Sequence, residues 1–343
     1  YNEALNTSTR GARKEFPSVA VIVLKDGNNI TIYDGDDPDM PMWMVFTGTS
    51  TAWAGPMLVL FSATRPGESV TALNGIVCLG TISSNDSESG LFAISFLTDS
   101  ATRYSSYHPH RRLQSIADRH VVLNHHAAEY EYTIVNGSVH DVAMTVLPNA
   151  PIDADTGLPV PTIAVATDGG VSVIKDDGNV FDIINSDGAN QARAVFFTPD
   201  NKIGCQLYDT ARGFRIFNIP TADVANSNHY TKGASTLEWY EGYWLQSSGT
   251  QVGDLRLLST GNSSPTSNLH AATPSDLAVG GVNGLSSISR NTTTPANGMI
   301  AYVTSDYNTG WMNGAIKLAT LSDTSTTNAV GTEILTNTNF TSG

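Results

Sequence analysis

The stretch "ATDGGVSVIKDDGNVFDI", residues 166–183, places two turn signals around one short alternating run. Gly169-Gly170 opens the run and Asp177-Gly178 closes it. Asp-Gly and Asn-Gly pairs favour two-residue hairpins, because both central residues of such turns adopt positive φ. The stretch therefore predicts a turn at 168–170, a short strand, and a second turn at 177–178, with no helix anywhere in 166–183.

The same order of apolar strand, tight polar turn and second strand recurs along the chain. It begins near residues 18, 69, 120, 161, 192, 236 and 275, roughly 30 to 50 residues apart. The equivalent first turns are Asp26-Gly27, Asn74-Gly75, Asp168-Gly169, Asp200-Asn201 and Asn283-Gly284. A unit of about four strands with this period is typical of a β-propeller blade.

We therefore expect an all-β fold, a β-propeller of six or seven blades with seven favoured. The first strand of the opening stretch is expected to line the central channel. Residues 1–17 predict a polar N-terminal arm, 18–320 the propeller, and 321–343 a linker with the start of a further β-sandwich module. A pair of large β-sandwiches is the structural alternative, which explains the turns but not the period.

The charge and hydropathy of the sequence indicate which classes of partner to exclude. The 343 residues carry a net charge of −14, and only 15% of them are charged. A surface of this sign repels phosphate backbones, so we expect no nucleic-acid partner. No apolar run approaches the roughly 18 residues that span a bilayer, so we expect no membrane insertion. The chain begins at Tyr1 without a signal segment, and we expect it to be a portion of a longer protein.

Cys78 and Cys205 each lie inside an apolar run, "IVCLG" and "IGCQL". They are predicted to be buried, reduced thiols that pack as small hydrophobic side chains. A disulfide between them stays open as the alternative, although two cysteines make no disulfide framework.

The run "DGDDPD" brings Asp34, Asp36, Asp37 and Asp39 into one turn. Its carboxylates could supply ligands for Ca²⁺, which takes six to eight oxygens. The EF-hand pattern is absent, because no Gly and no Glu stand at its sixth and twelfth positions. The alternative is a solvated acidic turn without an ion. We expect no other cofactor.

Six of the eight histidines lie between residues 108 and 140. His108 and His110 could meet His125 and His126 around Zn²⁺ or another transition metal, although the spacing matches no known site. The alternative is a polar hairpin that packs on a neighbouring subunit. For segment 108–126 we expect this second role, a projection whose subunit contact includes His108, His110, Arg111 and Arg112.

The densest aromatic cluster is "EWYEGYW", residues 238–244. In strand geometry Trp239 and Tyr243 share one face, and Tyr240 and Trp244 share the other. One of these faces is expected to be core, and the other can stack on sugar rings. Trp311, in the Gly- and Asn-rich "YNTGWMNG", is a second candidate plane. The alternative is that these rings only pack the last blades together.

Motifs for catalysis are absent. A propeller glycosidase needs carboxylates that converge on the channel, and the acidic residues here lie mostly in turns. The chain also contains no Gly-x-Ser-x-Gly elbow, no His-Glu-x-x-His and no Walker A loop. Propeller active sites are built from scattered positions, so an enzyme stays the alternative to a non-catalytic protein.

Three stretches resemble tail-fibre or tail-structural proteins of tailed bacteriophages, especially those of marine bacteria: 161–183, 18–46 and 304–324. In that group a propeller precedes laminin-G-like or other carbohydrate-binding modules. The C-terminal "GTEILTNTNFTSG" is similar to the first strand of a galactose-binding-like jelly roll, although Thr338 and Asn339 replace its Gly region.

The resemblance implies an extracellular virion component. It would be a homo-oligomer, would assemble with other tail or fibre subunits, and would present or form a surface that binds a host glycan. The alternatives are a carbohydrate-active propeller enzyme and a purely structural tail connector.

Overall fold

The computed structural model describes residues 3–25, 29–47, 67–82, 89–106, 109–112, 115–120, 133–154, 156–185, 191–207, 213–226, 236–241, 268–271, 276–281, 284–289, 299–305 and 316–323. Regular structure in these ranges is β-strand, apart from one 3₁₀ turn, η1 (Ile116–Asp118). The predicted all-β class is confirmed. Among these residues no helix is long and apolar enough to span a bilayer.

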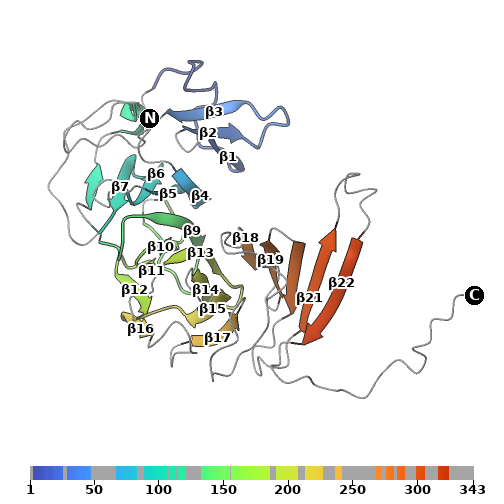
Figure 1. The fold of residues 1–343 in the computed structure, drawn as a ribbon. Coiled ribbons are helices and arrows are strands. Elements are labelled where there is room, and N and C mark those ends of the chain that lie inside the picture. Colours follow the sequence, from blue (N-terminus) through green and yellow to red (C-terminus); the bar gives the residue numbers. More distant parts are fainter. Residues whose placement is uncertain are drawn as a thin grey trace, which may run out of the picture.

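The strands form antiparallel meanders, in which each strand pairs mainly with its neighbour in sequence (Figure 1). The first sheet contains β1 (Ala20–Lys25), β2 (Asn29–Asp34) and β3 (Met42–Thr47). The second contains β4 (Gly67–Leu73), β5 (Ile76–Thr81), β6 (Leu91–Ser95), β7 (Ser100–Tyr104) and β8 (His110–Arg112). The third contains β9 (Val139–Thr145), β10 (Thr162–Thr167), β11 (Gly170–Ile174), β12 (Val180–Asn185) and β16 (Val224–Asn226), which pairs with β12 in parallel.

The fourth sheet contains β13 (Ala192–Phe197), β14 (Lys202–Leu207), β15 (Gly213–Asn218) and β17 (Thr236–Glu241). The fifth contains β18 (Asn268–Ala271), β19 (Asp276–Gly281), β20 (Gly284–Ser289), β21 (Met299–Ser305) and β22 (Ile316–Asp323).

The first strands of successive sheets pack against one another, β1 on β4, β4 on β9, β9 on β13 and β13 on β18. Within the described ranges this gives a propeller-like series of five sheets, which forms an open arc in Figure 1. The number of blades stays a prediction.

The opening stretch folds as predicted. A turn at 168–169 connects β10 to β11, and a second turn at 176–178 leads to β12. Its place in the repeat was predicted wrongly, because β10 is the second strand of its sheet and β9 is the first. The sequence of β9, "VHDVAMT", carries His and Asp within an apolar strand, and this hides the strand from an apolar pattern.

The other predicted turns use different geometries. Asn74 and Gly75 have φ of 49° and 71°, as a two-residue hairpin of type I′ requires. At Asp200-Asn201 only Asn201 is left-handed, with φ 58°, in a longer loop that Thr198 and Lys202 close. Residues 26–28 and 282–283 lie outside the described residues.

Apolar clusters fill the spaces between neighbouring sheets. Ile32 and Leu79 belong to the cluster between the first two sheets, and Val173 and Ile203 to the one between the third and fourth. Between the second and third sheets, Cys78 packs with Val165. Complete burial of such side chains contributes roughly 1.5–3 kcal/mol each. The second sheet and the third sheet each contribute residues to two of these clusters, one on either side, so both sheets are apolar on both faces.

The two cysteines are free and buried, as predicted for reduced thiols. Burial raises the pKa of both thiols to about 12. Neither thiol is therefore a reactive thiolate at neutral pH.

The N-terminal segment, expected to be a polar arm, is fastened to the outer edge of the first sheet. Arg10 forms a bridge with Met44, and the Val45 N–H donates to the Thr9 carbonyl at 2.9 Å. The Arg10 side chain is buried, with its guanidinium 4.4 Å from the Trp43 ring centre. Residues 9–11 thus extend the sheet beyond β3.

Candidate functional site

The strongest polar cluster lies where the first strands of the second, third and fourth sheets meet. We call it the strand junction: Ser69 of β4, His140 and Asp141 of β9, Arg193 and Val195 of β13, and Asp168 of the β10–β11 turn. Because these residues come from distant parts of the chain, no local motif predicted the cluster. The polar pair within β9 was its one sequence signal.

Asp141 connects all three sheets. Its Oδ1 accepts a hydrogen bond from the Ser69 hydroxyl at 2.8 Å, and its Oδ2 accepts from the Val195 N–H at 2.9 Å. The Oδ1 also accepts from the Val142 N–H at 2.9 Å. One carboxylate thus satisfies donors on both neighbouring sheets.

His140 lies between a carboxylate and a guanidinium. Its Nε2 is 2.8 Å from Asp168 Oδ1, and its Nδ1 is 2.8 Å from Arg193 Nη1. Arg193 Nη1 contacts Nε2 as well as Nδ1, so the guanidinium lies against both ring nitrogens while Nε2 also contacts Asp168. Arg193 also donates to Gln191.

Burial lowers the pKa of His140 below the ordinary 6.5, and the charge of Arg193 lowers it further. The hydrogen bond to Asp168 and the charges of Asp168 and Glu68 oppose this shift. The net direction keeps His140 neutral at pH 7, which suits a connection between β9 and β13.

Replacing Asp141 with alanine should lower the free energy of unfolding by about 1–3 kcal/mol, because the Ser69 hydroxyl and the Val195 N–H lose their acceptor. Urea denaturation followed by circular dichroism measures the change. In the exposed turn at Asp177, the matched Asp177→Ala variant should unfold close to the wild-type midpoint. Equal midpoints for Asp141→Ala and wild type would contradict a connecting role.

The His140 contacts predict a dependence of stability on pH. Because the folded pKa lies below 6.5, the unfolded chain takes up a proton first as the pH falls. The contribution of His140 is complete above about pH 6.5 and is lost as the pH falls through the folded pKa. We expect His140→Gln to flatten the fall in thermal midpoint between roughly pH 7.5 and 5. An unchanged slope in this variant would assign the pH dependence to other groups.

In the predicted calcium turn, Arg13 supplies positive charge. Its Nη1 lies 2.9 Å from Asp34 Oδ1 and 2.8 Å from Asp36 Oδ2. Asp36 also accepts from the hydroxyl and N–H of Ser18 and from the Val19 N–H, and these contacts, Ser18 first, lower its pKa to about 2.

The other two carboxylates of the turn lie on its exposed side. Asp37 accepts from the N–H of Asp39, as in an Asx turn. Within the described ranges, no three His, Cys, Asp or Glu residues are grouped to hold a metal ion. Calcium at this turn stays a prediction, and the single positive charge of Arg13 offsets part of the negative charge of Asp34 and Asp36.

The predicted subunit contact is described only in part. His110, Arg111 and Arg112 form β8, the last strand of the second sheet, so their backbone lies at a sheet edge. Edges of this kind can pair with another chain. His108, His125 and His126 lie outside the described residues.

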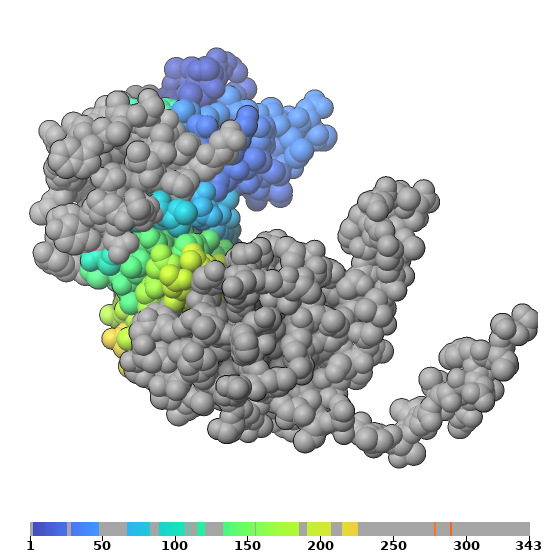
Figure 2. All heavy atoms as spheres, in the orientation of Figure 1, coloured from blue at the N-terminus to red at the C-terminus, as the bar shows by residue number. Residues whose placement is uncertain are grey.

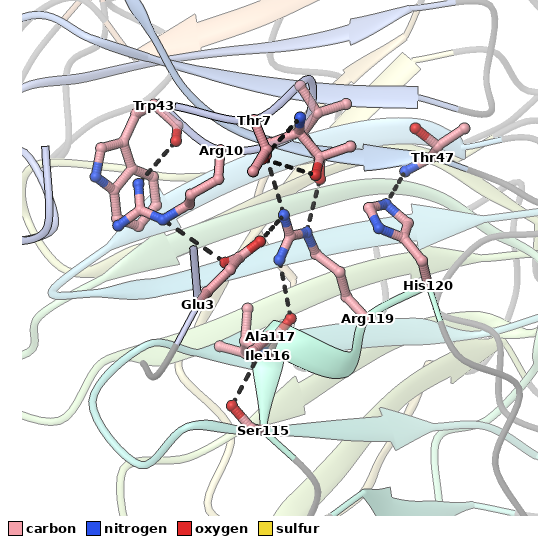
Figure 3. A network of polar contacts seen from close by, with 12 residues as sticks. Glu3, Thr7, Arg10, Trp43, Thr47, Ser115, Ile116, Ala117, Arg119 and His120 are labelled. Carbon is pink, nitrogen blue, oxygen red and sulfur yellow. Dashed lines mark hydrogen bonds and ion pairs between the residues drawn. The ribbon is translucent and has the colours of Figure 1, made fainter. Parts of the chain in front are cut away.

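Residues 115–120 do not project, contrary to the expectation for this segment. Ile116 and Arg119 are buried, and Arg119 contacts both the first sheet and the N-terminal segment (Figure 3). Its guanidinium donates to Glu3, Thr9, Val45 and Ile116. His120 Nε2 accepts from the Thr47 N–H at 3.1 Å.

Of the predicted aromatic cluster, the structure describes the backbone of Trp239 and Tyr240, both in β17. Trp239 lies in β17, where it pairs with Arg215 of β15. Tyr243, Trp244 and Trp311 lie outside the described residues. A ligand surface formed by these rings stays a prediction.

No family model and no curated protein sequence matches the chain. Among solved structures, a putative 6-phosphogluconolactonase from Bacteroides uniformis ATCC 8492 is 14% identical, with 88% of this chain and 73% of that one covered and a TM-score of 0.36. A second putative 6-phosphogluconolactonase, from Bacteroides fragilis NCTC 9343, is 12% identical over 82% and 80%, with a TM-score of 0.38. YCF48 bound to D1 peptide is 13% identical over 86% and 95%, with a TM-score of 0.33. Similarities this remote carry no conclusion about activity.

Proposed function

We propose that this chain is a non-catalytic, propeller-type scaffold of a phage tail fibre or tail tip, and that it presents a surface for a host glycan. The observation that carries the scaffold role is the connection of successive sheets through their first strands. Asp141 joins three sheets, and His140 with Arg193 joins two of them. The polar groups of the strand junction therefore hold sheets together.

The proposal that the chain belongs to a tail fibre rests on the sequence resemblance, and a propeller-type scaffold is compatible with that role. Loops on the faces of a propeller can vary without disturbing the strands that support them. The repeat spacing predicts six or seven blades, and the fibre setting predicts a homo-oligomer that contacts other tail subunits. Both belong to the proposal.

Glycan is the proposed ligand because sugar rings present apolar faces that stack on aromatic planes, while polar groups bind their hydroxyls. The candidate planes are Trp239, Tyr243, Trp244 and Trp311, beside Glu238 and Glu241. This rests on the sequence alone.

The purified chain should bind host-surface polysaccharide and compete with virions for adsorption. The double variant Trp244→Ala, Trp311→Ala should bind at least about tenfold more weakly, a change of ~1.4 kcal/mol. The matched control, Leu158→Ala, removes an exposed apolar side chain elsewhere and should bind normally.

The same preparation distinguishes the alternatives. Release of new reducing ends from the polysaccharide would identify a carbohydrate-active enzyme. Unchanged adsorption by virions that carry the double variant, with normal particle assembly, would contradict the aromatic platform. Failure of assembly without any glycan binding by the chain would favour a structural connector.

A further inference from the structure

Three successive sheets contain a β-bulge at the same place in their first strand. In β4, β9 and β13 the pairing with the second strand shifts beside the second residue, and the extra residue is Glu68, His140 or Arg193. The first strands of the first and fifth sheets, β1 and β18, pair with their neighbours without such a shift. A bulge leaves its extra residue out of the ladder and redirects a side chain.

The extra residue is ionisable in all three bulges. Apart from Asp141, these three are the only ionisable residues of their strands. The bulges before Ser69 and Asp141 could serve to place the next side chain in the strand junction, where these two hydrogen-bond. That reason fails for the third bulge, because the next residue is Ala194. Bulges that redirect polar side chains are frequent beside binding and active sites.

The three redirected side chains lie close together, because β9 packs against both β4 and β13 along the inner side of the arc (Figure 1). In the space-filling view the surfaces of the second, third and fourth sheets adjoin, coloured cyan, green and yellow-green (Figure 2). Arg193 Nη1 lies 2.8 Å from His140 Nδ1, and the charge of Glu68 acts on the His140 ring. Asp168 Oδ1 lies 3.6 Å from Arg193 Nη1.

We call this group the bulge site: Glu68, His140, Asp168, Gln191 and Arg193. Solvent reaches it, because Glu68 is exposed and the side chains of Arg193 and Asp168 are 25% and 32% exposed. Among the residues that the structure describes, the Glu68 carboxylate has no hydrogen-bond or ion-pair partner. The same holds, within those residues, for Asp168 Oδ2 and for the amide nitrogen of Gln191. Hydrogen-bond acceptors and a donor are therefore available beside the guanidinium.

The available groups match hydroxyls, which both donate and accept hydrogen bonds. Carboxylates can accept from sugar hydroxyls, and the Gln191 amide can donate to them. The charge of the site argues against an acidic sugar. Glu68 and Asp168 carry two negative charges, Arg193 carries one positive charge, and His140 is neutral at pH 7. A further carboxylate on the ligand would meet like charge.

We propose that a neutral sugar unit binds the bulge site through its hydroxyl groups. This inference rests on the proposed glycan role, and it adds a binding site that is separate from the aromatic cluster of residues 238–244. The strand junction keeps its structural role, because the connecting bonds of Asp141 use Ser69 and Val195.

Calorimetric titration tests the site with oligosaccharides of glucose, galactose and mannose, and with oligosaccharides of the corresponding uronic acids. At least one neutral oligosaccharide should bind, and its acidic counterpart should bind more weakly. Glu68→Ala should weaken the binding at least about tenfold, because the ligand loses a charged acceptor. The matched control, Asp39→Ala, removes an exposed carboxylate in another turn and should bind normally. Equal affinities for Glu68→Ala and wild type would overturn the proposal, as would tighter binding of the uronic acids.

Nuclear magnetic resonance of the histidine rings locates the bound sugar. The ring signals of His140, assigned by their loss in His140→Gln, should shift when the neutral oligosaccharide is added. Binding that leaves these signals unmoved would overturn the bulge site and leave glycan binding to the aromatic cluster. Failure of every neutral oligosaccharide to bind would also overturn it. Competition of the chain with virions for adsorption tests the glycan role separately.

Discussion

Arg119→Ala should lower the free energy of unfolding by about 3–5 kcal/mol, because the substitution breaks a buried ion pair by removing one partner. The Arg119 side chain is fully buried, and its Nη2 lies 2.8 Å from Glu3 Oε1. It also donates to the carbonyls of Thr9, Val45 and Ile116, which would lose a donor. The guanidinium lies 5.4 Å from the Phe46 ring centre.

Chemical denaturation at pH 7 measures this effect, with Arg13→Ala as the matched control. Arg13 pairs with Asp34 and Asp36 from a partly exposed position, so its loss should cost far less than the loss of Arg119. Arg119→Lys keeps the charge but not the planar fork, and should fall between the wild type and the alanine variant. Similar losses for Arg119→Ala and Arg13→Ala would contradict the anchoring role of Arg119.

Trp43→Ala should lower the free energy of unfolding by about 3–5 kcal/mol, the usual cost of deleting a large buried ring. Trp43 is 1% exposed and packs edge-on against Phe16 and Phe96, with centroid distances of 5.0 Å and 5.4 Å. The guanidinium of Arg10 stacks on the same ring. Removal of the indole therefore leaves a cavity beneath the N-terminal segment.

Trp43→Phe separates packing from polarity. The indole N–H has no hydrogen-bond partner among the residues that the structure describes, so phenylalanine loses little besides volume. We expect it to be much milder than alanine when both are measured by urea denaturation. Leu97→Ala, at an exposed position, should stay within about 0.5 kcal/mol of wild type. A Trp43→Phe variant as unstable as Trp43→Ala would show that the nitrogen has a role that the structure does not assign.

Local signals predicted the hairpins well. Asn74-Gly75 and Asp168-Gly169 mark real turns, because turn chemistry is encoded by adjacent residues. The phase of the repeat was harder to predict. β9 contains a half-buried Asp141 whose hydrogen-bond partners lie on other sheets, and an apolar sequence pattern does not detect such a strand.

The candidate site likewise could not be predicted from local sequence. His140, Asp168 and Arg193 meet through the fold, with no spacing between them that a motif could record. Arg10 and Arg119 look in sequence like surface cations, yet Glu3 lies between both guanidinium groups. Their burial depends on contacts between segments that are far apart in sequence, residues 3–14, 43–45 and 116–119, and composition cannot reveal these contacts.

The hydrogen bonds of Asp141 affect how cooperatively the protein unfolds. In stacked repeat architectures each unit contacts only its neighbours, and unfolding can spread from one end. In this chain the Asp141 carboxylate of the third sheet accepts hydrogen bonds from Ser69 of the second sheet and Val195 of the fourth. Unfolding of any one of these three sheets therefore leaves a polar group on another without its partner. The second, third and fourth sheets should therefore exchange their slowest amide hydrogens as one cooperative unit.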